Sequence, residues 1–314
     1  MPAPLTEKQA FLALNALPGI GPVALNRLLA AFGGDPRAVL ASDRRRLEAA
    51  AGDRPGAVEG VLGWKTRVDP VKEEERIGRA GIDFLTPGDD GYPVLLREIG
   101  DAPIGLYRKG PYGLNHPCVA VLGSRRATPY GQSVAGHLGA QLAALGFCVV
   151  SGLSRGIDTA AHEGALSVGG RTAAVLGTGI DIVFPPENLS LYRRIAEAGA
   201  VLSEFPLGRA ADPDSLSMRS RVISGMCEAV VVVESDLRGG AMTAARFAGE
   251  QGRLIFAVPG RIDQSSSSGT NQLIRDGATL FTRVEDLLEE LQYLGGQRPE
   301  PLRPSGAPRE PGAA

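Results

Sequence analysis

Small residues and one arginine interrupt an apolar run at residues 150–158, which read Val-Ser-Gly-Leu-Ser-Arg-Gly-Ile-Asp. The apolar residues before this turn predict a buried strand, and those after it predict a helix. Gly152, Ser154 and Gly156 keep the turn free of bulky side chains, so backbone N–H groups at the helix N-terminus can face an anion. Arg155 adds a permanent, forked cation. The pattern indicates a turn that binds phosphate.

A second turn of the same type lies about thirty residues upstream, a normal spacing for strand–turn–helix units. An apolar run at residues 119–122 is followed by Gly123, Ser124, Arg125 and Arg126 and then by a helical stretch. In a doubly wound sheet such turns lie along the carboxyl edge of the strands, where ligands bind. The glycines do not match the dinucleotide fingerprint. Two such turns therefore indicate a phosphorylated ligand without identifying a dinucleotide.

A third turn repeats this pattern near residue 240. Gly239 and Gly240 follow a strand that ends at Glu234, and Thr243 lies in the first turn of the next helix. A turn that only lets a helix pack closely on a sheet would have the same composition. Three such turns on one sheet edge favour a shared phosphate site.

Arg219 and Arg221 open a further helical segment in our prediction. Arg221 could clamp a phosphate or a carboxylate near the sheet edge. The alternative is a structural ion pair between Arg221 and an acidic neighbour such as Asp214 or Glu234. For Arg221, the sequence alone favours this ion pair.

His162 follows Asp158 by four residues and shares its helix face, so the two could form an acid–base pair. The favoured alternative is that Asp158 caps the helix and His162 makes a local hydrogen bond. No nucleophile, base and orienting group occur together in a credible context. The three cysteines are far apart and have no metal-ligand spacing. We therefore predict a binding protein without a metal or cofactor.

The composition is that of an ordinary globular protein. The chain has 314 residues, 43% of them hydrophobic and 22% charged, which is enough for two domains and a large core. Its net charge of −2 does not by itself indicate nucleic acid, although a local groove can still be basic. No apolar run is long enough to span a bilayer, and no secretory signal is present at the N-terminus. We expect a cytoplasmic protein that does not enter a membrane.

The order of predicted elements divides the chain into a helical part and an α/β part. Residues 1–65 predict a small all-helical domain, in which residues 17–29 have the form of a helix-hairpin-helix with a Gly-x-Gly turn. Such a turn either contacts a DNA phosphate or packs against protein, and the sequence leaves both alternatives open. Residues 66–292 form the α/β domain and begin with a charged, helix-forming connection. Residues 293–314 are Pro- and Gly-rich and predict a disordered tail.

The α/β part predicts an extended Rossmann-like, doubly wound and mostly parallel sheet, because strand-like and helix-like segments alternate. Continuously apolar runs such as residues 230–233 are typical of strands buried on both faces. Short strand-like runs precede them at 82–85, 92–96 and 104–107. The expected strands of the parallel sheet are 118–122, 147–151, 172–176, 200–203, 229–234 and 254–258. The expected helices are 131–145, 157–168, 188–198, 219–226, 241–251 and 284–292.

Many short motifs between residues 92 and 291 resemble, in order, those of the DNA-processing protein A family, also called DprA or Smf. The helical N-terminal part also resembles the sterile-alpha-motif-like (SAM-like) domain often found in this family. The motifs include Tyr92-Pro, Leu106-Tyr, Val121-Leu-Gly-Ser-Arg125, Tyr130-Gly131, Ser151-Gly-Leu-Ser-Arg-Gly-Ile-Asp158, Ala161-His162, Pro185-Pro-Glu-Asn188, Ser203-Glu204, Ala257-Val-Pro-Gly260 and Gly269-Thr-Asn271.

The resemblance implies a Rossmann domain that binds single-stranded DNA without base specificity and loads the RecA recombinase onto it in natural transformation and recombination. By position it gives phosphate contacts at Arg125 and Arg155. It also places a homodimer and recombinase contact at Ile274, Arg275 and Leu280. Independently, residues 273–281 predict a short helix and a terminal strand with apolar side chains around them. A two-fold partner could cover these side chains, or they could instead pack beneath the 284–292 helix.

The chain departs from the family pattern in two places. Ser220 stands between the two arginines where the family commonly has asparagine, and a Pro-rich tail stands where many members carry a winged-helix domain.

Two other functions compete with DNA binding. One is a Rossmann-fold hydrolase of nucleoside monophosphates, although its Pro-Gly-Gly-x-Gly-Thr loop is only partly matched here. The other is a helical adaptor whose hairpin binds protein.

Overall fold

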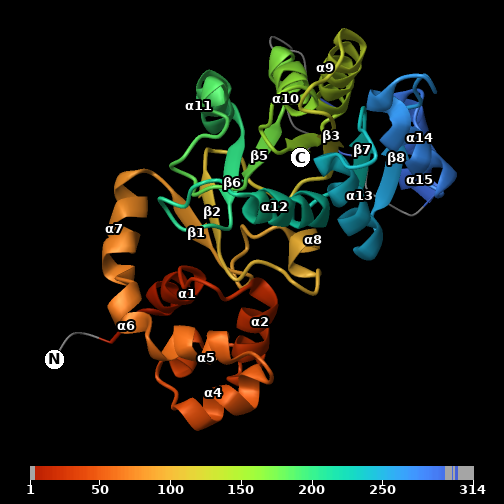
Figure 1. The fold of residues 1–314 in the computed structure, drawn as a ribbon. Coiled ribbons are helices and arrows are strands. Elements are labelled where there is room, and N and C mark those ends of the chain that lie inside the picture. Colours follow the sequence, from red (N-terminus) through yellow and green to blue (C-terminus); the bar gives the residue numbers. More distant parts are fainter. Residues whose placement is uncertain (1–3, 294–298, 300, 303–314) are drawn as a thin grey trace, which may run out of the picture.

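A nine-stranded sheet forms the centre of the computed structural model, which describes residues 4–293, 299, 301 and 302 (Figure 1). The strand order is β1-β2-β6-β5-β4-β3-β7-β8-β9. Strands β3 to β9 are parallel, and β1 and β2 join one edge in antiparallel pairing. This is the doubly wound, mostly parallel architecture that the sequence predicts. The strands are β1 (Asp83–Leu85), β2 (Leu106–Lys109), β3 (Cys118–Leu122), β4 (Cys148–Ser151), β5 (Thr172–Leu176), β6 (Ala200–Ser203), β7 (Ala229–Val232), β8 (Leu254–Ala257) and β9 (Thr279–Leu280).

Helices cover both faces of this sheet, because alternate strand residues are apolar on both sides. Ala120 and Leu122 of β3 share a core with α12 and α13, whereas Val119 and Val121 share a core with α9, α10 and α15. Figure 1 shows these two layers on opposite sides of the strands. The elements are α8 (Val94–Arg97), α9 (Pro129–Ala144), α10 (Ile157–Ser167), η1 (Pro186–Asn188), α11 (Leu189–Ala198), α12 (Pro213–Gly225), α13 (Gly240–Glu250), η2 (Ser265–Ser267), α14 (Ser268–Arg275) and α15 (Val284–Tyr293).

The N-terminal part is all helical and lies against the β1–β2 end of the sheet (Figure 1). Asn15 donates to the carbonyl of Glu204 at 2.9 Å, and Asn26 donates to the carbonyl of Ala102 at 2.8 Å. The segment expected as a connection contains α7, which packs on α1 and so extends the helical domain past residue 65. The helices are α1 (Glu7–Asn15), α2 (Pro22–Ala31), α3 (Pro36–Leu40), α4 (Arg44–Ala51), α5 (Pro55–Leu62), α6 (Trp64–Arg67) and α7 (Pro70–Arg79).

Two expected elements differ from the structure. The strand-like run at 92–96 belongs instead to a loop and the short helix α8, because Pro93 caps that helix. Helix α12 begins at Pro213, six residues before the expected start. A capping box between Asp212 and Ser215, with proline at the first helical position, nucleates it earlier. Arg219 and Arg221 are therefore interior helical residues, on different sides of α12.

The predicted tail at 293–314 lies almost entirely outside the described residues. Within the described ranges, none of the helices has the length and apolar character needed to cross a membrane. The three cysteines are buried and unpaired.

Candidate functional site

The three predicted turns interlock at the carboxyl edge of the parallel strands. Ser124, after β3, donates its N–H to the carbonyl of Glu234, after β7, at 2.7 Å. Ile157, at the start of α10, donates to the carbonyl of Ser124 at 3.2 Å. Gly156 has a φ of +74°, and a Cβ there would overlap the Ser124 carbonyl. The predicted convergence of these turns is confirmed, and glycine is required where two of them touch.

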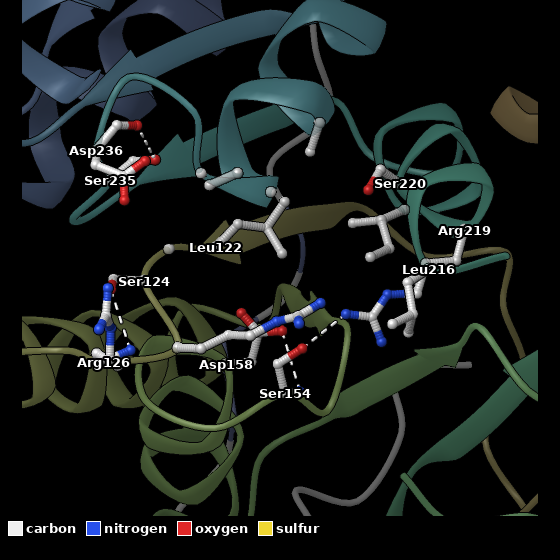
Figure 2. A pocket seen from close by; sticks show the side chains of 17 residues that line it. Leu122, Ser124, Arg126, Ser154, Asp158, Leu216, Arg219, Ser220, Ser235 and Asp236 are labelled. Carbon is white, nitrogen blue, oxygen red and sulfur yellow. Dashed lines mark hydrogen bonds between the residues drawn. The ribbon is translucent and has the colours of Figure 1, made fainter. Parts of the chain in front are cut away.

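A crevice of about 310 Å³ opens where they meet, at β3, from which the chain winds outward in both directions (Figure 2). This is the topological switch point, the usual ligand site of an open α/β sheet. Eight of the predicted residues line it: Gly123, Ser124, Arg125, Arg126, Ser154, Arg219, Gly239 and Gly240.

Arg219 forms the buried end of the crevice and ties α12 to the turn after β4. Its guanidinium donates to the carbonyl of Gly152 and, at 2.7 Å, to the Oγ of Ser154, the second of which Figure 2 shows. Asp158 lies beside it and accepts the N–H of Ser154 at 3.2 Å. Burial lowers the pKa of Arg219 and raises the pKa of Asp158, and each charge opposes the shift of the other. The two opposite charges stabilise each other, and the hydrogen bonds of both residues hold the turn after β4 in place.

Arg125 and Arg126 supply the uncompensated positive charge at the mouth of the crevice. Both are exposed, and among the described residues no carboxylate lies within ion-pair distance of either guanidinium. Arg125 is close enough to Arg219 to lower the pKa of that buried guanidinium, so the two cations repel each other. An anion placed between them would remove this repulsion. The geometry therefore suits a phosphate, which a forked guanidinium can bind through two hydrogen bonds.

Arg155, predicted as a phosphate contact, lies outside the crevice lining. It forms an exposed ion pair with Glu187, which raises the pKa of the guanidinium. Gly152 and Gly156 do not line the crevice, but the absence of a side chain at each allows the neighbouring residues to approach closely. A Cβ at Gly152 would clash with the Arg219 guanidinium.

Arg221 is fully buried and pairs with Glu204 and Asp101. The favoured interpretation as a structural ion pair is therefore confirmed, but with partners other than Asp214 or Glu234. We remove Arg221 from the proposed DNA contacts, because a phosphate cannot reach a guanidinium that is enclosed on all sides.

Glu234 and Thr243 also have roles other than lining the crevice. The Glu234 carboxylate accepts the N–H of Thr128 at 2.9 Å and its hydroxyl at 2.5 Å, which fixes the start of α9. Thr243 lies on α13 but does not line the crevice, whereas Ala241 and Ala244 of the same helix do.

His162 is sealed inside the domain rather than presented to a ligand. Its Nδ1 lies 2.7 Å from the hydroxyl of Thr172, and burial lowers its pKa to about 3. A neutral, enclosed imidazole cannot exchange protons with a substrate in the crevice. The favoured interpretation is therefore confirmed only in part. His162 makes a structural hydrogen bond, with Thr172 on β5, but Asp158 does not cap α10, because the N-cap residue is Gly156 and Asp158 lies inside the helix.

Several lining residues were not predicted, namely Leu216, Ser220, Ile223, Ser235 and Asp236. The first three lie on α12. Leu216 was missed because that helix was expected to begin at residue 219, whereas Ser220 and Ile223 lie within the expected helix and were not singled out as lining residues. Ser235 and Asp236 directly follow Glu234, so the position of the third turn could have indicated them. No group of three or more potential metal ligands occurs within the described parts of the chain.

The residues predicted to contact a second subunit and the recombinase lie on the far edge of the sheet, at β9 and the end of α14. Leu280 is 46% exposed, so it is not buried beneath α15, and Ile274 is partly exposed. Instead α15 packs Val284, Leu287 and Leu291 into the core. The alternative that both residues lie beneath this helix is wrong for Leu280.

Fold and crevice together define a Rossmann-like α/β protein with its ligand site at the switch point of the sheet. Residues 83–292 match the family model described as DNA recombination-mediator protein A, and the chain belongs to this family. It is 35% identical to the Smf protein of Synechocystis over 91% of this chain and 73% of that protein. It is 41% identical to the DNA processing protein DprA of Streptococcus pneumoniae over 65% of this chain and 73% of that protein.

Two solved structures are similar over most of the chain. The X-ray structure of DprA from Streptococcus pneumoniae has a TM-score of 0.79 and 31% identity, and it covers 92% of this chain and 99% of that one. A structure of DNA processing protein A from Helicobacter pylori, described for its single-stranded DNA binding mode, has a TM-score of 0.61 and 29% identity. The alignment covers 68% of this chain and 96% of that one.

Proposed function

We propose that this protein binds single-stranded DNA through its phosphates in the crevice at β3. The observation that carries the proposal is the exposed, unpaired pair of guanidinium groups, Arg125 and Arg126, on a turn fixed by two neighbouring turns. Backbone N–H groups in the first turn of α13, after its N-cap residue Gly239, add partial positive charge at a helix start. The Helicobacter relative's described single-stranded DNA binding supports this ligand class.

Binding through phosphates carries little base information, so we propose that recognition is independent of sequence. The test is a titration of the whole protein with oligothymidylate, oligoadenylate and a mixed sequence at about 50 and 200 mM salt. Similar affinities for the three strands, each falling steeply with salt, are expected. No binding at the lower salt concentration would overturn the proposal.

We further propose that the protein delivers the RecA recombinase to the bound strand in transformation and recombination. The family's description as a recombination mediator supports a recombinase partner. The exposed Leu280, with Ile274 and Arg275, gives a surface at the sheet edge for a homodimer and this partner. The test is assembly of RecA on DNA covered by single-strand binding protein: acceleration is expected, and an unchanged rate would contradict loading.

We propose that the protein acts in the cytoplasm and without catalysis. The carboxylates that a hydrolase would need are already engaged, since Asp158 is held beside Arg219 and Glu204 pairs with buried Arg221. Burial raises the pKa of Glu204, and this carboxylate does not line the crevice. Release of base from nucleoside monophosphates that disappears in Asp158→Ala would instead support the hydrolase.

A further inference from the structure

A second cleft, of about 580 Å³, is lined by the end of the same turn that supplies the crevice arginines. One side is formed by Thr128, Pro129 and Tyr130 at the start of α9. The other side is the loop after β8, from Pro259 to Gln264. Its volume falls within the range of about 300 to 1,000 Å³ that is typical of small-ligand pockets. We call it the Tyr130 cleft, and the phosphate contacts proposed above do not use it.

The far side of the Tyr130 cleft is rigidly built. Asn271 accepts the N–H of Gly260 at 3.2 Å and donates to its carbonyl at 3.0 Å. A Cβ at Gly260 would overlap the side chain of Ser267, so glycine is needed for this close approach. The Ala-Val-Pro-Gly and Gly-Thr-Asn motifs at 257–260 and 269–271 therefore have a structural purpose. They hold one wall of the cleft in a fixed position before any ligand binds.

Tyr130 is 58% exposed, which is high for so large a residue beside a cleft. Arg261 also lines the cleft, but its guanidinium makes two hydrogen bonds with Asp263, at 2.9 and 2.6 Å. The charge beside the cleft is thus neutralised, whereas Arg125 and Arg126 in the crevice are unpaired. The crevice therefore suits a phosphate, and the Tyr130 cleft suits a flat, uncharged group that can stack on an aromatic ring.

The crevice and the Tyr130 cleft are joined by hydrogen bonds between their walls. The N–H of Ser235 donates to the carbonyl of Ser266 and the N–H of Gly269 donates to the carbonyl of Ser235, each at 2.8 Å. Arg126 and Tyr130 are four residues apart, so their Cα atoms are separated by at most about 14 Å. One short nucleic-acid strand can reach both places at once.

We propose that the Tyr130 cleft receives a nucleobase of the strand whose phosphates lie in the crevice, with the base stacked on the Tyr130 ring. The inference rests on the proposed binding of single-stranded DNA. It adds that the surface contacts a base of the strand as well as its phosphates. Every base has a π-face, so stacking strengthens binding without selecting a sequence.

The experiment compares two strands of about 16 nucleotides, an upper site size for a single-strand groove: oligothymidylate and an abasic strand with the same phosphates. Both are titrated with wild-type protein, Tyr130→Ala and Tyr130→Phe. Tyr130→Ala is expected to bind oligothymidylate about 5- to 150-fold more weakly and to bind the abasic strand as the wild type does. Tyr130→Phe keeps the ring and should bind both strands as the wild type does.

Each other outcome overturns the inference. An equal loss on both strands would mean that Tyr130 acts through charge or structure, and no loss on either would mean that no base stacks there. A loss in Tyr130→Phe equal to that in Tyr130→Ala would assign the effect to the hydroxyl. Wild-type protein that binds neither strand would refute the proposed function itself. If Tyr130→Ala melts at a lower temperature, Tyr130→Trp decides, because oligothymidylate but not the abasic strand should quench the added indole fluorescence.

Discussion

Arg219 donates a hydrogen bond of 2.7 Å to Ser154, which joins the middle of helix α12 to the turn after β4. These residues are 65 positions apart in sequence, and both are buried. The contact lets one helix fix the shape of a turn on a different strand. It also leaves Arg125, at the mouth of the same crevice, facing a second positive charge.

Arg219→Ala is expected to destabilise the fold by about 3–5 kcal/mol, because it leaves the carboxylate of Asp158 buried without its counter-charge. The measurement is a urea denaturation curve. The double variant Arg219→Met, Asp158→Asn removes both charges and should recover much of the loss. Equal destabilisation in the single and double variants would show that the charge pair is not the cause.

His162 makes the stability of the protein depend on pH. Its folded pKa of about 3 lies below the ordinary value of 6.5, so the unfolded chain binds this proton more readily. Between those values, falling pH therefore favours unfolding, and the contribution is absent above about pH 6.5. At pH 4 the wild type should have lost about 3 kcal/mol relative to His162→Gln. If the free energy of unfolding changes with pH in the same way in both proteins, His162 is not the cause of the pH dependence.

Gly156→Ala tests the contact between the first two turns. Gly169 is a matched control, because it also has a positive φ, of +67°, but nothing lies near its missing Cβ. Gly169→Ala should lower the free energy of unfolding by about 1 kcal/mol, from backbone strain alone. Gly156→Ala should cost more and should weaken DNA binding, because its Cβ displaces Ser124. Equal losses of stability in the two variants, with unchanged DNA binding, would show that the contact between the turns does not shape the site.

Much of the fold could be predicted from sequence because its strands are short, continuously apolar runs separated by glycine turns. The bounds of β3, β5 and β6 agree with the prediction. Helix α12 was misplaced because its start depends on Asp212, a capping residue without a strong apolar pattern after it. The position of β9 at the sheet edge was expected because it is the last strand along the chain.

The site was harder to predict than the fold, because burial decides which arginines are available. Arg125, Arg155 and Arg221 look alike in sequence as cations near a sheet edge. The structure leaves Arg125 unpaired, pairs Arg155 with Glu187 and encloses Arg221 with Glu204. These differences depend on contacts between distant segments, which no local pattern records.

The homodimer is tested by Ile274→Glu combined with Leu280→Glu, followed by light scattering and a thermal melt. Because Leu280 is 46% exposed, the charges should separate the subunits without unfolding them. Val168→Glu is the control, since Val168 is similarly exposed, at 44%, on another surface. A dimer that persists in the double variant would exclude this interface.

The central claim is that Arg125 and Arg126 bind phosphates, and the slope of log affinity against log salt concentration tests it most directly. Each single-strand phosphate contact contributes about 0.7 to this slope, so Arg125→Ala combined with Arg126→Ala should reduce it by about 1.4 and weaken binding. Arg79→Ala, on the distant helix α7, should change neither quantity, and Arg155→Ala should have a smaller effect because Arg155 is already paired. A folded double variant with wild-type affinity and slope would contradict the account.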